Sequence, residues 1–285
     1  MTPFLTSDGS TLHYAIIGNG PRIALTPGGR ESGLVLMPLV ELLARECCVL
    51  IWDRRNCGSS DLYFETARSE YEIWADDLAE LLVGIDFAPA LIGGGSAGCR
   101  VSVNAVMRHP AIARAMILWS VSGGPFAAHF LGHIYHEIYI EAAQEGGMEA
   151  VAETPFFAAR IAENPANRER LLGMDPARFI AAMRRWNEAF HTRPPEPIAG
   201  VSSGVAAIRV PTLVFDGNDD IHPPMSAEAL AGLIPTARLA PSPWRRDEWM
   251  GRFNGTVPGS IFDLYPRLVP QMLEFISSLD GTQDR

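Results

Sequence analysis

The chain has 285 residues, of which 47% are hydrophobic and 20% charged, so it can bury a sizeable core and is not expected to be disordered. A net charge of −10 disfavours nucleic acid and anionic lipid as main partners. The four cysteines form no C-x-x-C pair and no apolar run approaches the roughly 20 residues of a membrane span, which argues against a zinc site, a disulfide framework and a bilayer-spanning helix. The opening residues carry no secretory pattern, and we therefore expect a cytoplasmic protein.

In the first part of the chain, short apolar runs alternate with helical patterns. Runs rich in β-branched or apolar residues, bounded by glycine or proline, predict strands over 11–18, 22–26, 47–53, 90–95 and 115–121. Apolar residues at helical spacing predict helices over 34–46, 69–85 and 97–110. This order of strand and helix is typical of parallel βαβ units with right-handed crossovers.

The alternation breaks between residues 122 and 205, where helical patterns dominate and a proline-rich stretch follows. It resumes with segments predicted as strand, helix, strand and helix over 210–217, 226–234, 237–240 and 261–279. We therefore expect a core formed by residues 1–121 and 206–285, interrupted by a helical insertion over 122–205.

The sequence LIGGGSAGCR (91–100) places Ser96 in a G-x-S-x-G pattern between a predicted buried strand and a helix. Such a strand-to-helix turn is strained and exposes the serine hydroxyl, and side chains at Gly94 or Gly98 would collide with neighbouring backbone. The start of the following helix offers N–H donors to a developing oxyanion. The alternative is a phosphate-binding loop or a plain tight turn, but G-x-G-x-x-G and a Walker lysine are both missing.

Three further segments stand in the order and spacing of one family. They are LTPGGR (25–30), WDRRNCGSSD (52–61) and PTLVFDGNDD (211–220). With the serine turn, they resemble the oxyanion loop, the D-x-R-G-x-G-x-S-D loop and the acid-bearing strand of the α/β-hydrolase superfamily. The resemblance covers nearly the whole chain. It implies an α/β-hydrolase fold, a mostly parallel eight-strand sheet flanked by helices, with the insertion as a helical cap that closes a pocket.

The resemblance also implies roles for individual residues. Ser96 would be the nucleophile, and the backbone N–H groups of Ala97 and Gly29 (or Gly28) would form the oxyanion hole. Pro27 stands where the family usually has histidine, a tolerable change because backbone amides do the chemistry there. A serine at the turn argues against the dehalogenase and epoxide-hydrolase branches, which use a carboxylate nucleophile.

The histidine that this family carries after its last strand is missing, because Trp244 occupies the place and no histidine follows His222. By the G-x-x-D count Asp220 would be the catalytic acid, with Asp219 a close alternative. His222 is the main candidate for the base, since two extended residues span at most roughly 7 Å and two prolines follow it. An ordinary solvated loop histidine is the alternative.

Three other histidines lie at i, i+4 and i+7 in the insertion, at His129, His133 and His136. On a regular helix they would share one face, suited to a pocket wall, to a base above the serine or, less favourably, to a metal. The charged segment WRRDEW is either a solvated loop or a pocket mouth that uses Trp244 or Trp249.

The sequence thus predicts a serine hydrolase that acts on a small, largely apolar ester, lactone or C–C substrate through an acyl-enzyme. Its catalytic residues would be Ser96, Asp220 and His222, and Gly28, His133 and Trp244 would contact the substrate. No metal or organic cofactor is expected, and a homodimer is left open. The alternative is a non-hydrolytic member of the same fold, either a small-molecule binder or a cofactor-free lyase or isomerase.

Overall fold

A computed structural model describes residues 1–190 and 203–280. Its eight strands form one sheet in the order β1-β2-β4-β3-β5-β6-β7-β8. The strands are β1 (Thr2–Leu5), β2 (Thr11–Ile17), β3 (Arg22–Thr26), β4 (Cys48–Asp53), β5 (Ala90–Gly95), β6 (Ala113–Trp119), β7 (Thr212–Phe215) and β8 (Ala237–Ala240). The two pairs β1–β2 and β2–β4 are antiparallel, and the five others are parallel. The predicted mostly parallel sheet is confirmed; β1 was not predicted, because it is a short, largely exposed edge strand.

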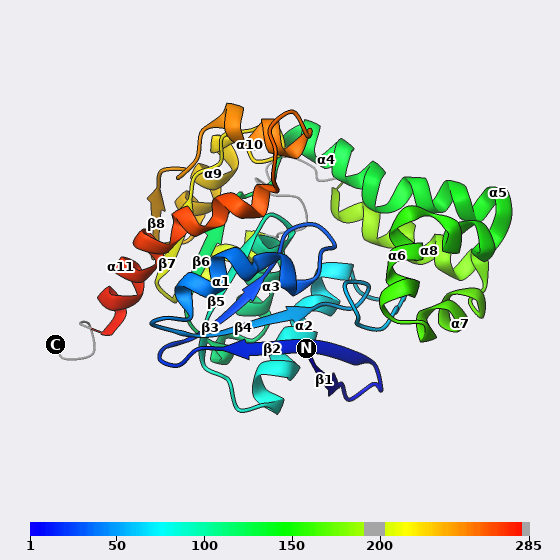
Figure 1. Cartoon of the computed structure of the whole chain (residues 1–285), viewed down its shortest axis with the longest axis horizontal. Helices are drawn as coiled ribbons and strands as arrows, with labels where there is room; N and C mark the ends of the chain where they lie inside the picture. The colour runs from blue at the N-terminus through cyan, green and yellow to red at the C-terminus, as the bar shows by residue number, and fades with distance from the viewer. Residues whose placement is uncertain (191–202, 281–285) are drawn as a thin grey trace.

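Helices cover both faces of the sheet, and alternate residues of each central strand pack against one set or the other (Figure 1). In β4, Leu50 and Trp52 face one core, whereas Val49 and Ile51 face the second. The first core is completed by α2 (Glu70–Gly84), α3 (Ala97–Arg108) and α9 (Pro224–Leu233). The second is completed by α1 (Met37–Leu43), α10 (Arg246–Phe253), η6 (Ile261–Leu268) and α11 (Val269–Asp280).

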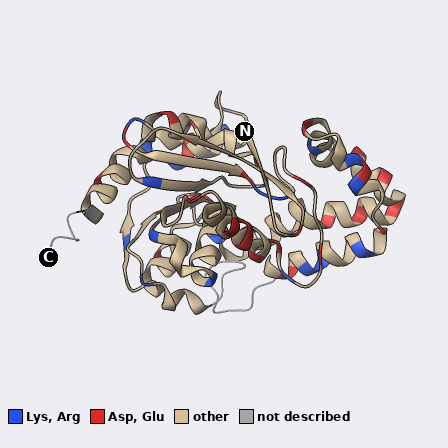
Figure 2. Ribbon diagram, turned by 90° about the horizontal axis from the view of Figure 1, so that it is seen from below, with Lys and Arg blue, Asp and Glu red and all other residues tan. Residues whose placement is uncertain are grey.

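Between β6 and β7 the chain leaves the sheet and forms a group of helices that projects to one side (Figure 1). We call them the inserted helices: α4 (Gly124–Gly132), the π-helix η3 (His133–Glu137), α5 (Ile138–Glu153), α6 (Pro155–Glu163), α7 (Ala166–Leu172) and α8 (Pro176–Asn187). They bury an aromatic cluster that includes Phe157, Phe179 and Trp186 and that Leu62 and Ile73 join from outside the insertion. Acidic and basic residues are interspersed along these helices (Figure 2). The C-terminal part of the predicted insertion lies partly outside the described residues.

Three segments differ from the sequence-based prediction. The final helix predicted over 261–279 is divided into the 3-10 helix η6 and the α-helix α11. The helix predicted over 34–46 is divided into a 3-10 turn, η1 (Gly33–Leu36), and α1, because Pro38 fits only the first turn of an α-helix. The charged run after Trp244 is not a loop but the helix α10. Among the residues that the structure describes, no helix is long and apolar enough to cross a membrane.

Candidate active site

Ser96 lies on the sharp turn between β5 and α3, with a φ of 53° and a ψ of −114°. This left-handed backbone conformation is rare for a residue with a side chain. Glycines on both sides make the turn sterically allowed: a Cβ at Gly98 would lie 2.1 Å from the carbonyl oxygen of Thr26, and one at Gly94 would lie 2.3 Å from that of Gly98. The G-x-S-x-G pattern therefore folds as predicted, as a strand-turn-helix, and Ser96 lines a cavity.

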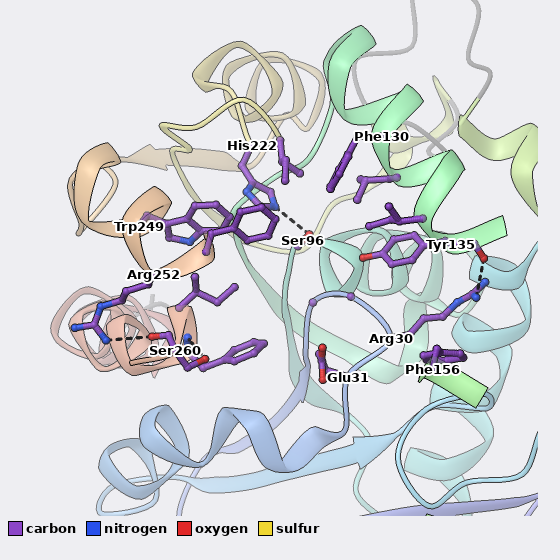
Figure 3. Close-up of a pocket in the computed structure, with 18 of the residues that line it drawn as sticks. Arg30, Glu31, Ser96, Phe130, Tyr135, Phe156, His222, Trp249, Arg252 and Ser260 are labelled. Carbon is purple, nitrogen blue, oxygen red and sulfur yellow. Dashed lines mark hydrogen bonds between the residues drawn. The ribbon is translucent and has the colours of Figure 1, made fainter. Parts of the chain in front are cut away.

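His222 lies beside this serine, with its Nε2 3.0 Å from Ser96 Oγ (Figure 3). On the other side of the ring, Nδ1 lies 2.9 Å from Asp219 Oδ2 and 3.1 Å from Oδ1. A single tautomer satisfies both contacts: Nδ1–H donates to the carboxylate, and Nε2 accepts from the serine hydroxyl. This is the arrangement in which an imidazole can take the proton of an attacking hydroxyl.

The acid that contacts the histidine is Asp219, and the prediction of Asp220 is wrong. The side chain of Asp220 is 56% exposed and pairs with Arg246 at 2.7 Å on the surface. That of Asp219 is 2% exposed and lies against the imidazole. The chain turns tightly after Asp219, whose N–H donates to the carbonyl of His222 at 3.3 Å, and this turn directs Asp219 rather than Asp220 towards the imidazole.

Asp219 is held as an ionised acceptor. Its carboxylate accepts hydrogen bonds from the backbone N–H groups of Ile221 and His222, at 2.8 and 2.9 Å, as well as from the imidazole. Burial is the largest single effect and raises the pKa of Asp219, but these hydrogen bonds and the nearby His222 together bring it below its ordinary value. The negative charge is therefore kept beside the imidazole at neutral pH.

Close backbone packing gives the loop this shape. A Cβ at Gly217 would lie 2.0 Å from the carbonyl oxygen of His222, so the loop closes on itself only with glycine there. Beyond the histidine, Pro223 has extended backbone and Pro224 occupies the first turn of α9, where its missing N–H costs nothing. The backbone of His222 is therefore restrained on one side by its close packing against Gly217 and on the other by the two prolines at the start of α9.

We expect Gly217→Ala to destabilise the fold by about 1–3 kcal/mol, because the added methyl forces the loop to shift. Since the shifted backbone carries His222, activity should fall as well. Gly232→Ala is the matched control: it lies in α9 with no atom within 4 Å of an added Cβ, and should stabilise by about 0.5–1 kcal/mol. Urea unfolding of both variants checks this; equal midpoints would contradict it.

The loop that follows β3 lies directly against the serine. A Cβ at Gly28 would lie 3.1 Å from the Cβ of Ser96, and Gly28 and Gly29 both line the cavity. The buried Arg54 donates to the carbonyls of Gly28 and Gly29, at 3.4 and 2.9 Å. The carbonyl of Gly28 and the N–H of Gly29 belong to one trans peptide and point in opposite directions. Because Arg54 binds that carbonyl, the N–H of Gly29 points away from Arg54. Ala97 starts α3, so its N–H lacks an intrahelical partner.

The cavity has a volume of about 530 Å3 and is mostly apolar. Besides Ser96 and the loop with Ile221 and His222, its walls come from three parts of the chain: the loop after β3, the inserted helices, and the segment from α10 to η6. Aromatic and aliphatic side chains dominate, including Phe130, Ile134, Tyr135, Phe156, Trp249 and Phe262 (Figure 3). A site of this kind suits a small, largely apolar molecule.

Trp244 does not line the cavity, contrary to the prediction. It is buried in the second core, where its ring stacks on Tyr265 with centroids 5.7 Å apart. Trp249, which lies inside α10, lines the cavity instead. Its ring meets the His222 ring edge-to-face, with the ring centroids 5.2 Å apart. The two tryptophans take different positions because α10 begins between them. The charged residues at the start of this helix made the segment resemble a loop in the sequence.

The three histidines of the insertion do not share a face, because the π-helix η3 changes the residue spacing. His133, predicted to contact substrate, is 47% exposed and lies 3.2 Å from Glu137. His129 is exposed, whereas His136 is buried with its Nε2 3.3 Å from Arg30 Nη2. None of the three lines the cavity. Within residues 1–190 and 203–280, no group of three or more His, Cys, Asp or Glu side chains is placed to hold a metal ion.

Sequence comparison adds three relationships. The model of the alpha/beta hydrolase family matches residues 23–270. An uncharacterised hydrolase, YraK, of Bacillus subtilis is 31% identical over 109 residues, 38% of this chain and 40% of that protein. The polyketide synthase ThaQ of Burkholderia thailandensis is 28% identical over 245 residues, 78% of this chain and 11% of that protein. The matched regions thus span less than half of either relative.

Solved structures share the fold over almost their full length. An esterase from Thermogutta terrifontis has a TM-score of 0.62 at 21% identity, covering 98% of this chain and 97% of that one. The enol-lactonase of Burkholderia xenovorans has a TM-score of 0.58 at 19% identity, covering 100% of both chains. Together with the family model, which spans most of the sequence, these matches show that the chain belongs to the alpha/beta hydrolase family.

Proposed function

We propose that the protein is a serine hydrolase that cleaves a small, largely apolar ester or lactone through an acyl-enzyme. The observation that carries the proposal is the continuous contact from Ser96 through His222 to Asp219 at the floor of an apolar cavity. The esterase and the enol-lactonase with the same fold are consistent with it.

In the proposed mechanism, Ser96 Oγ attacks the substrate carbonyl while His222 Nε2 takes the hydroxyl proton. Asp219 keeps the imidazole oriented and stabilises the imidazolium that forms. The N–H groups of Ala97 and Gly29 would hold the oxyanion, each worth about 3–4 kcal/mol in the transition state. His222 then gives its proton to the leaving oxygen, and later activates the water that releases the acid.

The inserted helices would act as the cap of this site. Phe130, Ile134 and Phe156 bring apolar surface from them to the cavity that Ser96 faces. Such a cap would exclude water and contact the part of the substrate that is remote from the reacting bond. We therefore propose that the insertion determines which substrates bind.

A fluorophosphonate probe tests the proposal directly. Ser96 Oγ should displace fluoride from the phosphorus and give a stable adduct, located by mass spectrometry on the peptide that contains Ser96. Ser96→Ala should not be labelled. Ser102→Ala is the control: it removes a buried hydroxyl from α3, the helix that follows Ser96, at a position outside the cavity. This variant should label like the wild type. A folded wild type that takes no label would overturn the proposal in favour of a non-hydrolytic binder, lyase or isomerase.

A further inference from the structure

Tyr135 brings a hydroxyl group to the loop that faces the nucleophile. The residue lies in the middle of η3 and lines the cavity. Its Oη is 3.5 Å from the position that a Cβ on Gly29 would occupy, and among the three nearest atoms there it is the only hydroxyl. Figure 3 shows the phenol pointing from the inserted helices towards Ser96. Tyr135 therefore extends into the space beside the proposed oxyanion hole.

The ring is held in place by the same loop. Arg30 Nη1 donates to the backbone carbonyl of Tyr135 at 2.8 Å, and the guanidinium lies over the Tyr135 ring, 5.5 Å from its centroid. Glu70 accepts from the same arginine at 2.9 Å, with both side chains 4% exposed. A residue next to Gly29 thus fixes both the loop and the helix turn that carries the phenol. Such a position leaves little freedom for the ring to turn away.

The Tyr135 hydroxyl has no hydrogen-bond partner in the described parts of the chain, although the ring is well packed. Burial raises the pKa of Tyr135, so the group keeps its proton and can serve as a donor at any pH the enzyme would work at. Because Tyr135 lines the cavity, its hydroxyl can donate a hydrogen bond to a molecule bound there. Single π-turns within helices also occur frequently at functional sites.

We propose that Tyr135 is a catalytic residue whose O–H donates the third hydrogen bond to the oxyanion, beside the N–H groups of Gly29 and Ala97. The inference rests on the proposed serine hydrolase function. When Ser96 Oγ bonds to the carbonyl carbon, the π electrons move to the carbonyl oxygen and the serine proton goes to His222. The new oxyanion accepts from Tyr135, which keeps its proton. Collapse re-forms the C=O bond and expels the leaving oxygen, protonated by His222.

The test is Tyr135→Phe, assayed with p-nitrophenyl butyrate. Because the hydrogen bond strengthens as charge develops, kcat should fall about 100-fold while KM changes less than about threefold. Inhibition by an aliphatic trifluoromethyl ketone, which forms a charged hemiketal with the serine, should weaken by a similar factor. Tyr63→Phe is the control: its hydroxyl contacts Glu65 outside the cavity, and its loss should leave both values unchanged.

A series of butyrate esters with different leaving groups separates this role from proton donation to the leaving oxygen. An oxyanion donor should cost the same factor for every ester, whereas a loss that grows as the leaving group becomes more basic would overturn the proposal. Unchanged kcat and ketone affinity in a folded Tyr135→Phe would also overturn it. If wild type takes no fluorophosphonate, the serine hydrolase function itself fails; if wild type labels and only the tyrosine effects are missing, this inference alone fails.

Discussion

His222→Ala should lower kcat by about 10⁵- to 10⁶-fold, close to the loss expected for Ser96→Ala. Within residues 1–190 and 203–280, His222 is the one histidine that lines the cavity, and its Nε2 is 3.0 Å from Ser96 Oγ. Without it the serine hydroxyl has no neighbouring base and is a weak nucleophile at neutral pH. Steady-state kinetics with p-nitrophenyl butyrate, combined with fluorophosphonate labelling, measure the effect.

Two properties make the expected result specific. His133→Ala, which removes an exposed imidazole that pairs with Glu137, should retain wild-type kcat. The double variant of Ser96 and His222 to alanine should be scarcely slower than either single variant, because the two residues act as one unit. Retention of more than about 1% of kcat in His222→Ala would contradict the assignment.

The sheet and the serine turn were predictable because their signals are local and redundant. In β4 and β5, every residue but one is buried. The sequence of such strands is a nearly continuous apolar run, which is typical of a strand buried on both faces of a parallel sheet. The turn at Ser96 requires glycine at two fixed positions for steric reasons. The loop histidine could also be found, because chain reach alone restricts where His222 can lie.

The remaining site residues depended on side-chain direction, which composition does not encode. Asp219 and Asp220 are chemically equivalent neighbours, and the turn of the loop decides which one meets the imidazole. Trp244 and Trp249 are equally apolar and both pack in the second core, so the sequence does not show that Trp249, and not Trp244, also lines the cavity. The π-helix has no simple sequence signature, and Tyr135, which lines the cavity, lies within it.

Asp219→Asn should lower kcat about 10⁴-fold, while Asp220→Asn, its matched neighbour, should leave kcat within about twofold of wild type. The amide of asparagine can donate to Nδ1 and so favours the tautomer that carries its proton on Nε2, where it blocks acceptance from Ser96. Asp220 meets only Arg246 on the surface, an interaction that contributes little to stability or catalysis. Equal losses in both variants, or a loss only in Asp220→Asn, would contradict the geometry.

The same pair of variants predicts a pH dependence of stability. Because the pKa of Asp219 is lower in the folded protein than in the unfolded chain, the carboxylate stabilises the fold above the unfolded pKa of about 4. This contribution is lost as the pH falls through the lower, folded pKa. Urea unfolding of wild type and Asp219→Asn should therefore differ at pH 7 and converge as the pH falls through the folded pKa of Asp219. Asp220→Asn should follow the wild-type curve throughout, since its partner is solvated and its charge screened. A constant offset between wild type and Asp219→Asn at every pH would mean that the asparagine acts through packing rather than through the lost charge.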